Sequence, residues 1–258
     1  MNKNNQWHHA CQKLETQGSA YCLATILSKS GSVPGETGAK MVITANEEFG
    51  SLGGGKLEFD VINKARKELT SSEIKIGSEG FMLDNKHGQA CGGSLKVLFE
   101  YRNINQPKVV IFGAGHVCQS LCLILSQLPC SVTVVDSRKE WLDKLEPLNI
   151  ITRHSEQPES IISELSEHTS ILVMTHEHQL DFKVVQYALE RNCFSYVGLI
   201  GSKSKRKQAE RYLNEHLSAP ELLSQLTCPI GHPDIKGKLP MQIAVSVSAQ
   251  LISRFTSS

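Results

Sequence analysis

The sequence predicts an α/β protein in which a Rossmann-like parallel sheet, with helices on both faces, follows a smaller α+β domain. The 258 residues exceed the roughly 100–150 of a typical single domain. The polar segment "YRNINQPK" (101–108) separates two differently patterned halves, and only the second alternates apolar runs with helical stretches. We therefore predict an N-terminal domain over residues 1–104 and a C-terminal Rossmann-like domain over residues 105–258.

In the C-terminal half, short apolar runs are typical of buried parallel strands. We expect five strands, at 109–112, 132–135, 150–152, 171–174 and 196–200. After the first strand, apolar residues recur at three- and four-residue spacing, as in a helix that buries one stripe against a sheet. They are Val117, Leu121, Ile124, Leu125 and Leu128.

The N-terminal half mixes helices and strands without the strand–helix alternation of the second half. Its elements are expected as a helix over 6–17 ended by Gly18, strands over 21–27 and 40–44, a helix over 56–69 and a strand over 95–101.

Composition excludes several partner classes. The 27 basic and 26 acidic side chains leave almost no net charge, so neither nucleic acid nor an anionic membrane is expected. No apolar run approaches the roughly 20 residues that span a bilayer, and the start "MNKNNQWHH" has no signal-peptide core. The eight cysteines form no Cys-x-x-Cys pair, which argues against a zinc ribbon. We expect a cytoplasmic protein with reduced thiols.

The stretch "VVIFGAGHV" (109–117) predicts a phosphate-binding turn. Gly113 and Gly115 allow a tight turn whose following helix points free N–H groups at an anion. Asp136 ends the next strand, where Rossmann folds place an acid that binds a ribose. Cys118 replaces the third glycine of the fingerprint, and His116 stands where a pyrophosphate needs clearance. The alternative is a structural turn without a ligand.

Two further groups follow predicted strands. In "MTHEHQLD" (174–181), His176, Glu177, His178 and Asp181 suit ligand hydrogen bonding or helix capping better than a closed metal site.

In "VGLIGSKSKRK" (197–207), Gly201 and the N-cap candidate Ser202 precede a run of cations. The cations are Lys203, Lys205, Arg206 and Lys207. Positive charge at the start of a helix opposes the helix dipole, so a bound phosphate is expected to compensate it. The alternative is a solvent-exposed basic face.

The N-terminal half has two glycine clusters. The first, before the helix expected over 56–69, indicates close approach of a ligand or another backbone, and comprises Gly53, Gly54 and Gly55 with Glu58. In the second, glycines such as Gly92 leave Cys91 open to neighbouring N–H groups that lower a thiol pKa. A buried, inert Cys91 is the alternative. Nothing in the sequence nominates a general acid, a general base and a nucleophile that act together, so an accessory role is expected rather than an enzyme.

Several motifs together resemble one family, the XdhC/CoxI-type xanthine dehydrogenase accessory proteins. The matching segments are "GSVPGETGAKM" (31–41), "GSLGGGKLE" (50–58), "ACGGSL" (90–95), "FGAGHV" (112–117), "VVDSR" (134–138), "MTHEHQLD" (174–181), "VGLIGSKSKR" (197–206) and "CPIG…IKGKLPMQIAVSVSAQL" (228–251). Two positions depart from the family pattern. Gly35 stands where an arginine is usual, and His232 stands where a leucine is usual.

The resemblance implies a chaperone that binds new molybdenum cofactor (molybdopterin), with or without an attached nucleotide. The chaperone protects this cargo while an L-cysteine desulfurase supplies its sulfido ligand, and passes it to the xanthine dehydrogenase molybdenum subunit. A homodimer is a further possibility. Cys91 is then the candidate for contacting molybdenum, and Gly113, Gly115 and the cations near Lys205 are candidates for the phosphate. The alternatives are an NAD(P)-dependent oxidoreductase, which would need Asp136 but not Cys91, and a nucleotide-sensing module.

Overall fold

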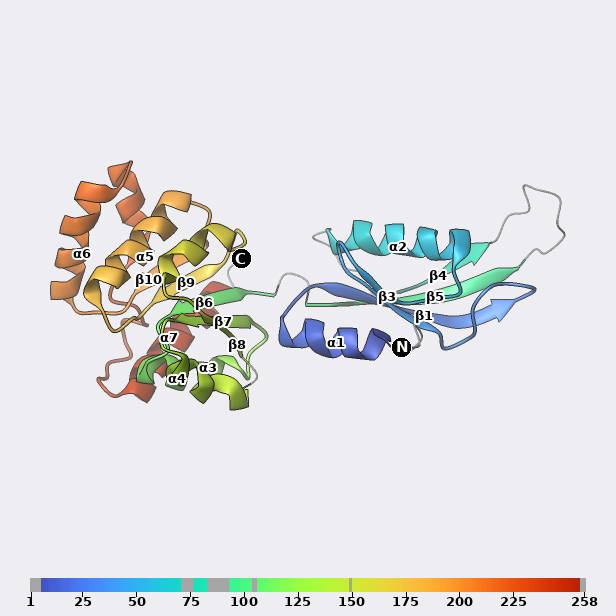
Figure 1. Cartoon of the computed structure of the whole chain (residues 1–258), viewed down its shortest axis with the longest axis horizontal. Helices are drawn as coiled ribbons and strands as arrows, with labels where there is room; N and C mark the ends of the chain where they lie inside the picture. The colour runs from blue at the N-terminus through green and yellow to red at the C-terminus, as the bar shows by residue number, and fades with distance from the viewer. Residues whose placement is uncertain (1–5, 71–76, 83–92, 104–105, 149, 256–258) are drawn as a thin grey trace. The chain divides into compact units, whose positions relative to one another are not determined.

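A computed structural model describes residues 6–70, 77–82, 93–103, 106–148 and 150–255, except for the side chain of Thr16. The chain divides into two compact units, Met1–Asn105 and Gln106–Ser258, and the boundary expected from the sequence lies between residues 104 and 105. Figure 1 shows both units. Within the described ranges, no helix has the length and apolarity to cross a membrane.

The N-terminal unit is built on an antiparallel sheet in the order β3-β2-β1-β5-β4. Its elements are α1 (Gln6–Thr16), β1 (Tyr21–Ser30), β2 (Lys40–Ile43), β3 (Glu48–Gly50), α2 (Gly55–Leu69), β4 (Gly77–Met82) and β5 (Ser94–Arg102). The α+β character expected from the sequence is confirmed. The structure adds β3 and β4, which the sequence analysis missed because one has three residues and the other, "GSEGFM", has no β-branched side chain.

The two helices of this unit cover opposite faces of the sheet (Figure 1). Leu57 and Val61 of α2 pack against alternate residues of β1 such as Ala24. Leu14 of α1 packs against the other face, beside Val42 of β2. The alternation of side chains along each strand thus feeds two separate apolar layers.

The C-terminal unit is a parallel sheet in the order β11-β10-β9-β6-β7-β8. Its elements are β6 (Lys108–Phe112), α3 (His116–Leu125), β7 (Ser131–Asp136), α4 (Lys139–Leu142), β8 (Ile151–His154), β9 (Ser170–Val173), α5 (His178–Arg191), β10 (Tyr196–Leu199), α6 (Lys203–His216), β11 (Leu226–Thr227) and α7 (Pro240–Phe255), with 3₁₀ turns at Asp143–Leu148, Pro158–Glu164 and Pro220–Gln225.

Helices cover both faces of this sheet, which confirms the Rossmann-like prediction. One face packs against α3 and α7, and the other packs against α5 and α6. All five expected strands are present. The expectation of only five strands was wrong, because the two-residue strand β11 pairs with Val197 and Gly198 at the sheet edge. A pair of residues carries no periodic signal.

The order of the parallel strands locates the candidate ligand region. From β6 the chain proceeds to β7 and β8 on one side and then returns to β9 on the other side. The carboxyl ends of β6 and β9 therefore lie next to each other at the topological switch point, where open α/β sheets bind ligands. The turn after β6 begins at Gly113, and the turn after β9 contains Thr175.

Two loops of the N-terminal unit pack backbone against backbone. Gly35 has φ +83°, and a Cβ atom there would lie 2.1 Å from the carbonyl oxygen of Leu52. A Cβ atom on Gly53 would lie 2.3 Å from the backbone nitrogen of Gly35. Glycine is required on both loops, so Gly35 occupies a position that has no room for the arginine expected from the family pattern.

Replacing Gly35 with alanine should destabilise the N-terminal unit by more than about 3 kcal/mol, since both the backbone angle and the collision oppose the side chain. Gly38→Ala is the matched control, because Gly38 has φ +88° but open space at its Cβ position, so only strain of about 1–2 kcal/mol is expected. Urea unfolding of the full chain measures both. Equal losses would show that the two loops do not pack as described.

Candidate functional site

The turn after β6 is held against the end of β9. Gly113 has φ +106°, and a Cβ atom there would lie 2.4 Å from the carbonyl oxygen of Met174. Its N–H donates to the carbonyl of Val135 at 2.8 Å, and the N–H of Met174 donates to the carbonyl of Phe112 at 2.8 Å. Gly113 is therefore required by packing, whether or not a ligand binds beside it.

Gly115 has a different environment from Gly113. It is the N-cap of α3, with φ −65°, and no heavy atom of the described residues lies within 4 Å of the position that a Cβ atom would take. In the part of the chain that the structure describes, no side chain caps this helix end. The first N–H groups of a helix lack intrahelical partners and attract anions. The open part of the turn is thus Gly115 and the start of α3, where His116 is exposed.

Asp136, at the end of β7, holds this turn in place through hydrogen bonds of its carboxylate. Its side chain is only 3% exposed. The N–H of Ala114 donates to Oδ2 at 2.7 Å, while Arg138 donates from its backbone N and Nε to Oδ1, both at 2.9 Å, and from Nη2 to Oδ2 at 2.8 Å. Burial alone would raise the pKa of Asp136, but the bonds from Arg138 and Ala114 hold that pKa below its ordinary value.

A second buried carboxylate organises the loop after β9. Asp181 is fully buried in α5, and its Oδ1 accepts from the backbone N–H and the hydroxyl of Thr175 at 2.9 and 2.8 Å. Lys205 of α6 donates to Oδ2 at 2.5 Å. His176 is exposed on this loop, and His178 is exposed as the first residue of α5. No group of metal-ligating side chains is found within the described ranges.

The start of α6 has the predicted N-cap and an unpredicted set of charge partners. Ser202 Oγ accepts the N–H of Lys205 at 3.2 Å, and the stem of Lys205 lies over Gly201. Arg206 bonds Glu210 at 2.6 Å and the carbonyl of Leu226 at 2.7 Å. Both cations are thus compensated by groups of the protein itself, while Lys203 and Lys207 remain exposed.

In the N-terminal unit, Glu58 organises the first glycine cluster. Its Oε2 accepts from Ser51 Oγ at 2.6 Å and from the N–H groups of Leu52 and Gly54 at 2.9 and 3.0 Å. Open space surrounds the Cβ positions of Gly54 and Gly55, both at positive φ. Cys91 and Gly92 lie outside the described residues, so the structure places neither of these predicted site residues.

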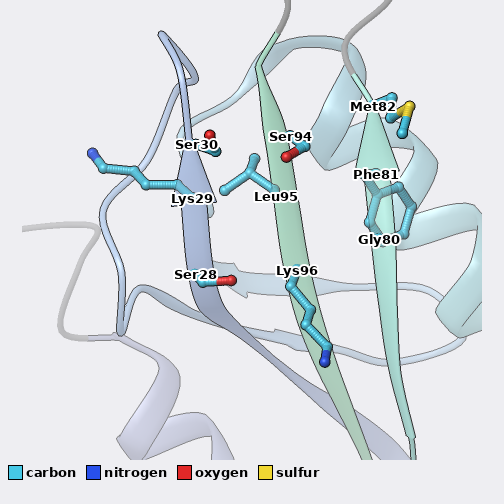
Figure 2. Close-up of a pocket in the computed structure, with 9 residues that line it drawn as sticks. All are labelled: Ser28, Lys29, Ser30, Gly80, Phe81, Met82, Ser94, Leu95 and Lys96. Carbon is cyan, nitrogen blue, oxygen red and sulfur yellow. The ribbon is translucent and has the colours of Figure 1, made fainter.

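A pocket of about 340 Å³ lies across β1, β5 and β4 in the same unit (Figure 2). Strand register pairs Ser28 with Lys96 and Ser30 with Ser94, so these four polar side chains share one face of the sheet. The sequence does not reveal this group, because its members come from separate strands and carry no local motif. Hydroxyl and ammonium groups there suit a hydrogen-bonding ligand.

Arg138 and Trp141 are the other residues that the sequence analysis missed. Trp141 carries the guanidinium of Arg138 5.0 Å from its ring centre and the ammonium of Lys144 4.0 Å from it. His116 meets the same ring edge-on at 5.0 Å. The one sequence feature that indicates a role for this pair is the position of Arg138, two residues after a strand that ends in aspartate.

Asp136→Asn should destabilise the C-terminal unit by about 1.5–3 kcal/mol at neutral pH, because the charge-assisted bonds from Arg138 are lost while Arg138, 26% exposed, keeps some access to water. The folded-state pKa of Asp136 is lowered, so its stabilising contribution is complete above the unfolded-state pKa and is lost as the pH falls through the folded-state pKa. The difference from wild type should therefore shrink below pH 3.8, the ordinary value. Urea unfolding across this range measures it.

Asp143→Asn is the control for Asp136→Asn. Asp143 is half-exposed and pairs with Lys139 at 3.3 Å on the surface, so a change within about 1 kcal/mol is expected. A pH-independent difference between wild type and Asp136→Asn would contradict the assigned ionisation.

Comparisons with known proteins agree with this architecture. Residues 109–251 match the XdhC Rossmann domain, and residues 14–76 match the XdhC and CoxI family. The protein YqeB of Escherichia coli K12, described as uncharacterized, is 27% identical over 244 residues, which are 93% of this chain and 44% of that protein. This chain thus spans less than half of that curated relative.

A crystal structure described as a xanthine dehydrogenase from Bacillus halodurans has the same fold. It aligns with a TM-score of 0.51 and 20% identity over 100% of this chain and 96% of that one. The Rossmann-domain match alone covers more than half of the chain, and the second match precedes it in the N-terminal unit. The chain belongs to the XdhC and CoxI family.

Proposed function

We propose that the chain binds newly made molybdenum cofactor, protects it while its sulfido ligand is installed, and passes it to xanthine dehydrogenase. Membership of the XdhC family suggests a role in xanthine dehydrogenase maturation, and the binding, sulfuration and insertion steps are the finer proposal. Its partners would be the molybdenum subunit of xanthine dehydrogenase and an L-cysteine desulfurase. We place the protein in the cytoplasm, where these partners would be made.

The observation that carries the proposal is the open backbone at Gly115. The cofactor is a pterin with one phosphate, and a phosphate fits an uncapped helix start. Gly113 and Ala114 are fixed by Met174 and Asp136, so the turn needs little rearrangement when an anion arrives. Binding of a phosphate at such a preformed turn therefore costs little ordering of the loop.

Cys91 is the proposed contact to the molybdenum centre, since molybdenum in this cofactor is bound by sulfur and a thiolate is a soft ligand. Several other cysteines are poorly suited to that role. Burial raises the pKa of Cys22 to about 12 and that of Cys130 to about 11. The pKa of Cys118 is raised by the neighbouring Cys122 thiol and by burial. These thiols stay protonated at neutral pH.

Gly115→Leu should weaken molybdenum cofactor binding at least about tenfold, because the side chain enters the space that a phosphate would use and one lost charge-assisted bond is worth about 1.5–3 kcal/mol. Gln127→Leu adds the same side chain at an exposed position just beyond the other end of α3 and should leave binding unchanged. The affinity is measured by titrating each apoprotein with isolated cofactor, and the melting temperature verifies the fold. Wild-type affinity of Gly115→Leu would show that the turn is only structural.

Cys91→Ala should let bound cofactor lose its sulfido ligand faster, or weaken its retention, since the proposed sulfur contact is removed. Retained pterin and cyanide-releasable sulfur measure the two effects, and activation of apo xanthine dehydrogenase reports delivery. Cys193→Ala, at a half-buried cysteine of the other unit, is the matched control. If Cys91→Ala and Cys193→Ala behave alike, Cys91 has no role in holding the cofactor.

The alternative function is that of an NAD(P)-dependent oxidoreductase. It differs from the chaperone proposal in the ligand that the protein should bind and in the reaction that should follow. Saturable binding of a nicotinamide dinucleotide together with hydride transfer to a substrate would replace the chaperone proposal. Nucleotide binding without hydride transfer would not, because a Rossmann domain can bind a nucleotide for other purposes.

A further inference from the structure

The carboxylate of Asp136 has no remaining acceptor capacity. A carboxylate offers about four hydrogen-bonding positions. Here Oδ1 accepts two donors of Arg138, and Oδ2 accepts one from Arg138 and one from Ala114. In Rossmann folds the acid at this strand end accepts the hydroxyls of an adenosine ribose. A bare ribose could bind Asp136 only by displacing Arg138.

Arg138 presents a fixed cation at the same position. Its side chain is 26% exposed, and among the contacts of the described residues Nη1 has no hydrogen-bond partner. The bond to Asp136 and the ring of Trp141 hold the guanidinium in place. Lys144, exposed and 4.0 Å from that ring, adds a second cation. At this strand end a ligand thus meets the donors and positive charge of Arg138 and Lys144 instead of the acceptor oxygens of Asp136.

This cationic group lies beside the open turn. Asp136 bonds both Arg138 and the Ala114 N–H, and Ala114 immediately precedes Gly115. An anion at the start of α3 and an anion at Arg138 would therefore be neighbours in one site. A nucleotide with a 5′-phosphate and a second phosphate on its ribose carries two anions in one molecule, as such a pair of neighbouring positions would require.

We infer that the carboxyl end of β7 selects a nucleotide whose ribose carries a 2′-phosphate over one with a bare ribose, and that Arg138 determines this preference. The Arg138 guanidinium supplies the planar donors that phosphate oxygens accept. Its ligand differs from molybdenum cofactor, and the experiment below contains no cofactor. Failure of this inference and failure of the chaperone proposal are therefore separate results.

Calorimetric titration of the full chain with 2′,5′-ADP, 3′,5′-ADP, 5′-AMP and inorganic phosphate tests the inference. We expect 2′,5′-ADP to bind at least about tenfold more tightly than 5′-AMP, as one charge-assisted bond would give. Weaker binding of 3′,5′-ADP and of inorganic phosphate identifies the 2′-position. Equal affinity for 5′-AMP, equal competition by inorganic phosphate, or no saturable binding of 2′,5′-ADP would each overturn the inference.

Arg138→Ala gives the sharper result, because it removes the cation and frees the acceptors of Asp136 together. The preference should reverse, with 2′,5′-ADP losing at least about tenfold and 5′-AMP gaining affinity. Arg138→Lys keeps the charge without the fork and should lower the ratio even if Arg138→Ala fails to fold. Arg153→Ala, whose arginine pairs with exposed Glu164 on the surface, should leave the ratio unchanged. An unchanged ratio in a folded Arg138 variant would refute the assignment.

Discussion

The candidate ligand site depends on one buried carboxylate, that of Asp136. Four donors converge on it, from the backbone of Ala114 and from Arg138. Because an unpaired buried charge is costly, the turn after β6 and the residues after β7 must keep the positions that satisfy it. The open start of α3 and the placement of Arg138 both follow from this constraint.

Asp181 has the corresponding role at the next strand. It holds Thr175 of the loop after β9 and Lys205 of α6, so two buried acids fix the carboxyl edge of the sheet. Asp136 and Asp181, which the sequence predicts to contact a ligand, therefore hold backbone and cations of the protein in place. The groups that remain available to a ligand are backbone N–H groups and exposed side chains. Such groups suit a site that binds and releases a molecule without changing it.

Strands β6, β7, β9 and β10 of the C-terminal unit could be predicted because each contains a short, buried apolar run. The two-residue β11 could not, and neither could the partner of Lys205. Asp181 lies 24 residues before that lysine, and the fold brings them together only because β9 and β10 are parallel neighbours. Gly113 and Gly115 look alike in the sequence, but packing against Met174 closes one and leaves the other open. Such distinctions arise from tertiary contacts, which local pattern does not encode.

The central functional claim is that this member of the XdhC and CoxI family carries molybdenum cofactor. The most direct measurement is mass spectrometry and fluorescence of the small molecules released when the protein, purified from cells that make the cofactor, is heat-denatured. We predict release of a phosphorylated pterin in near-stoichiometric amount, together with molybdenum. Release of no pterin from fully folded protein, under conditions in which the cells accumulate the cofactor, would contradict it.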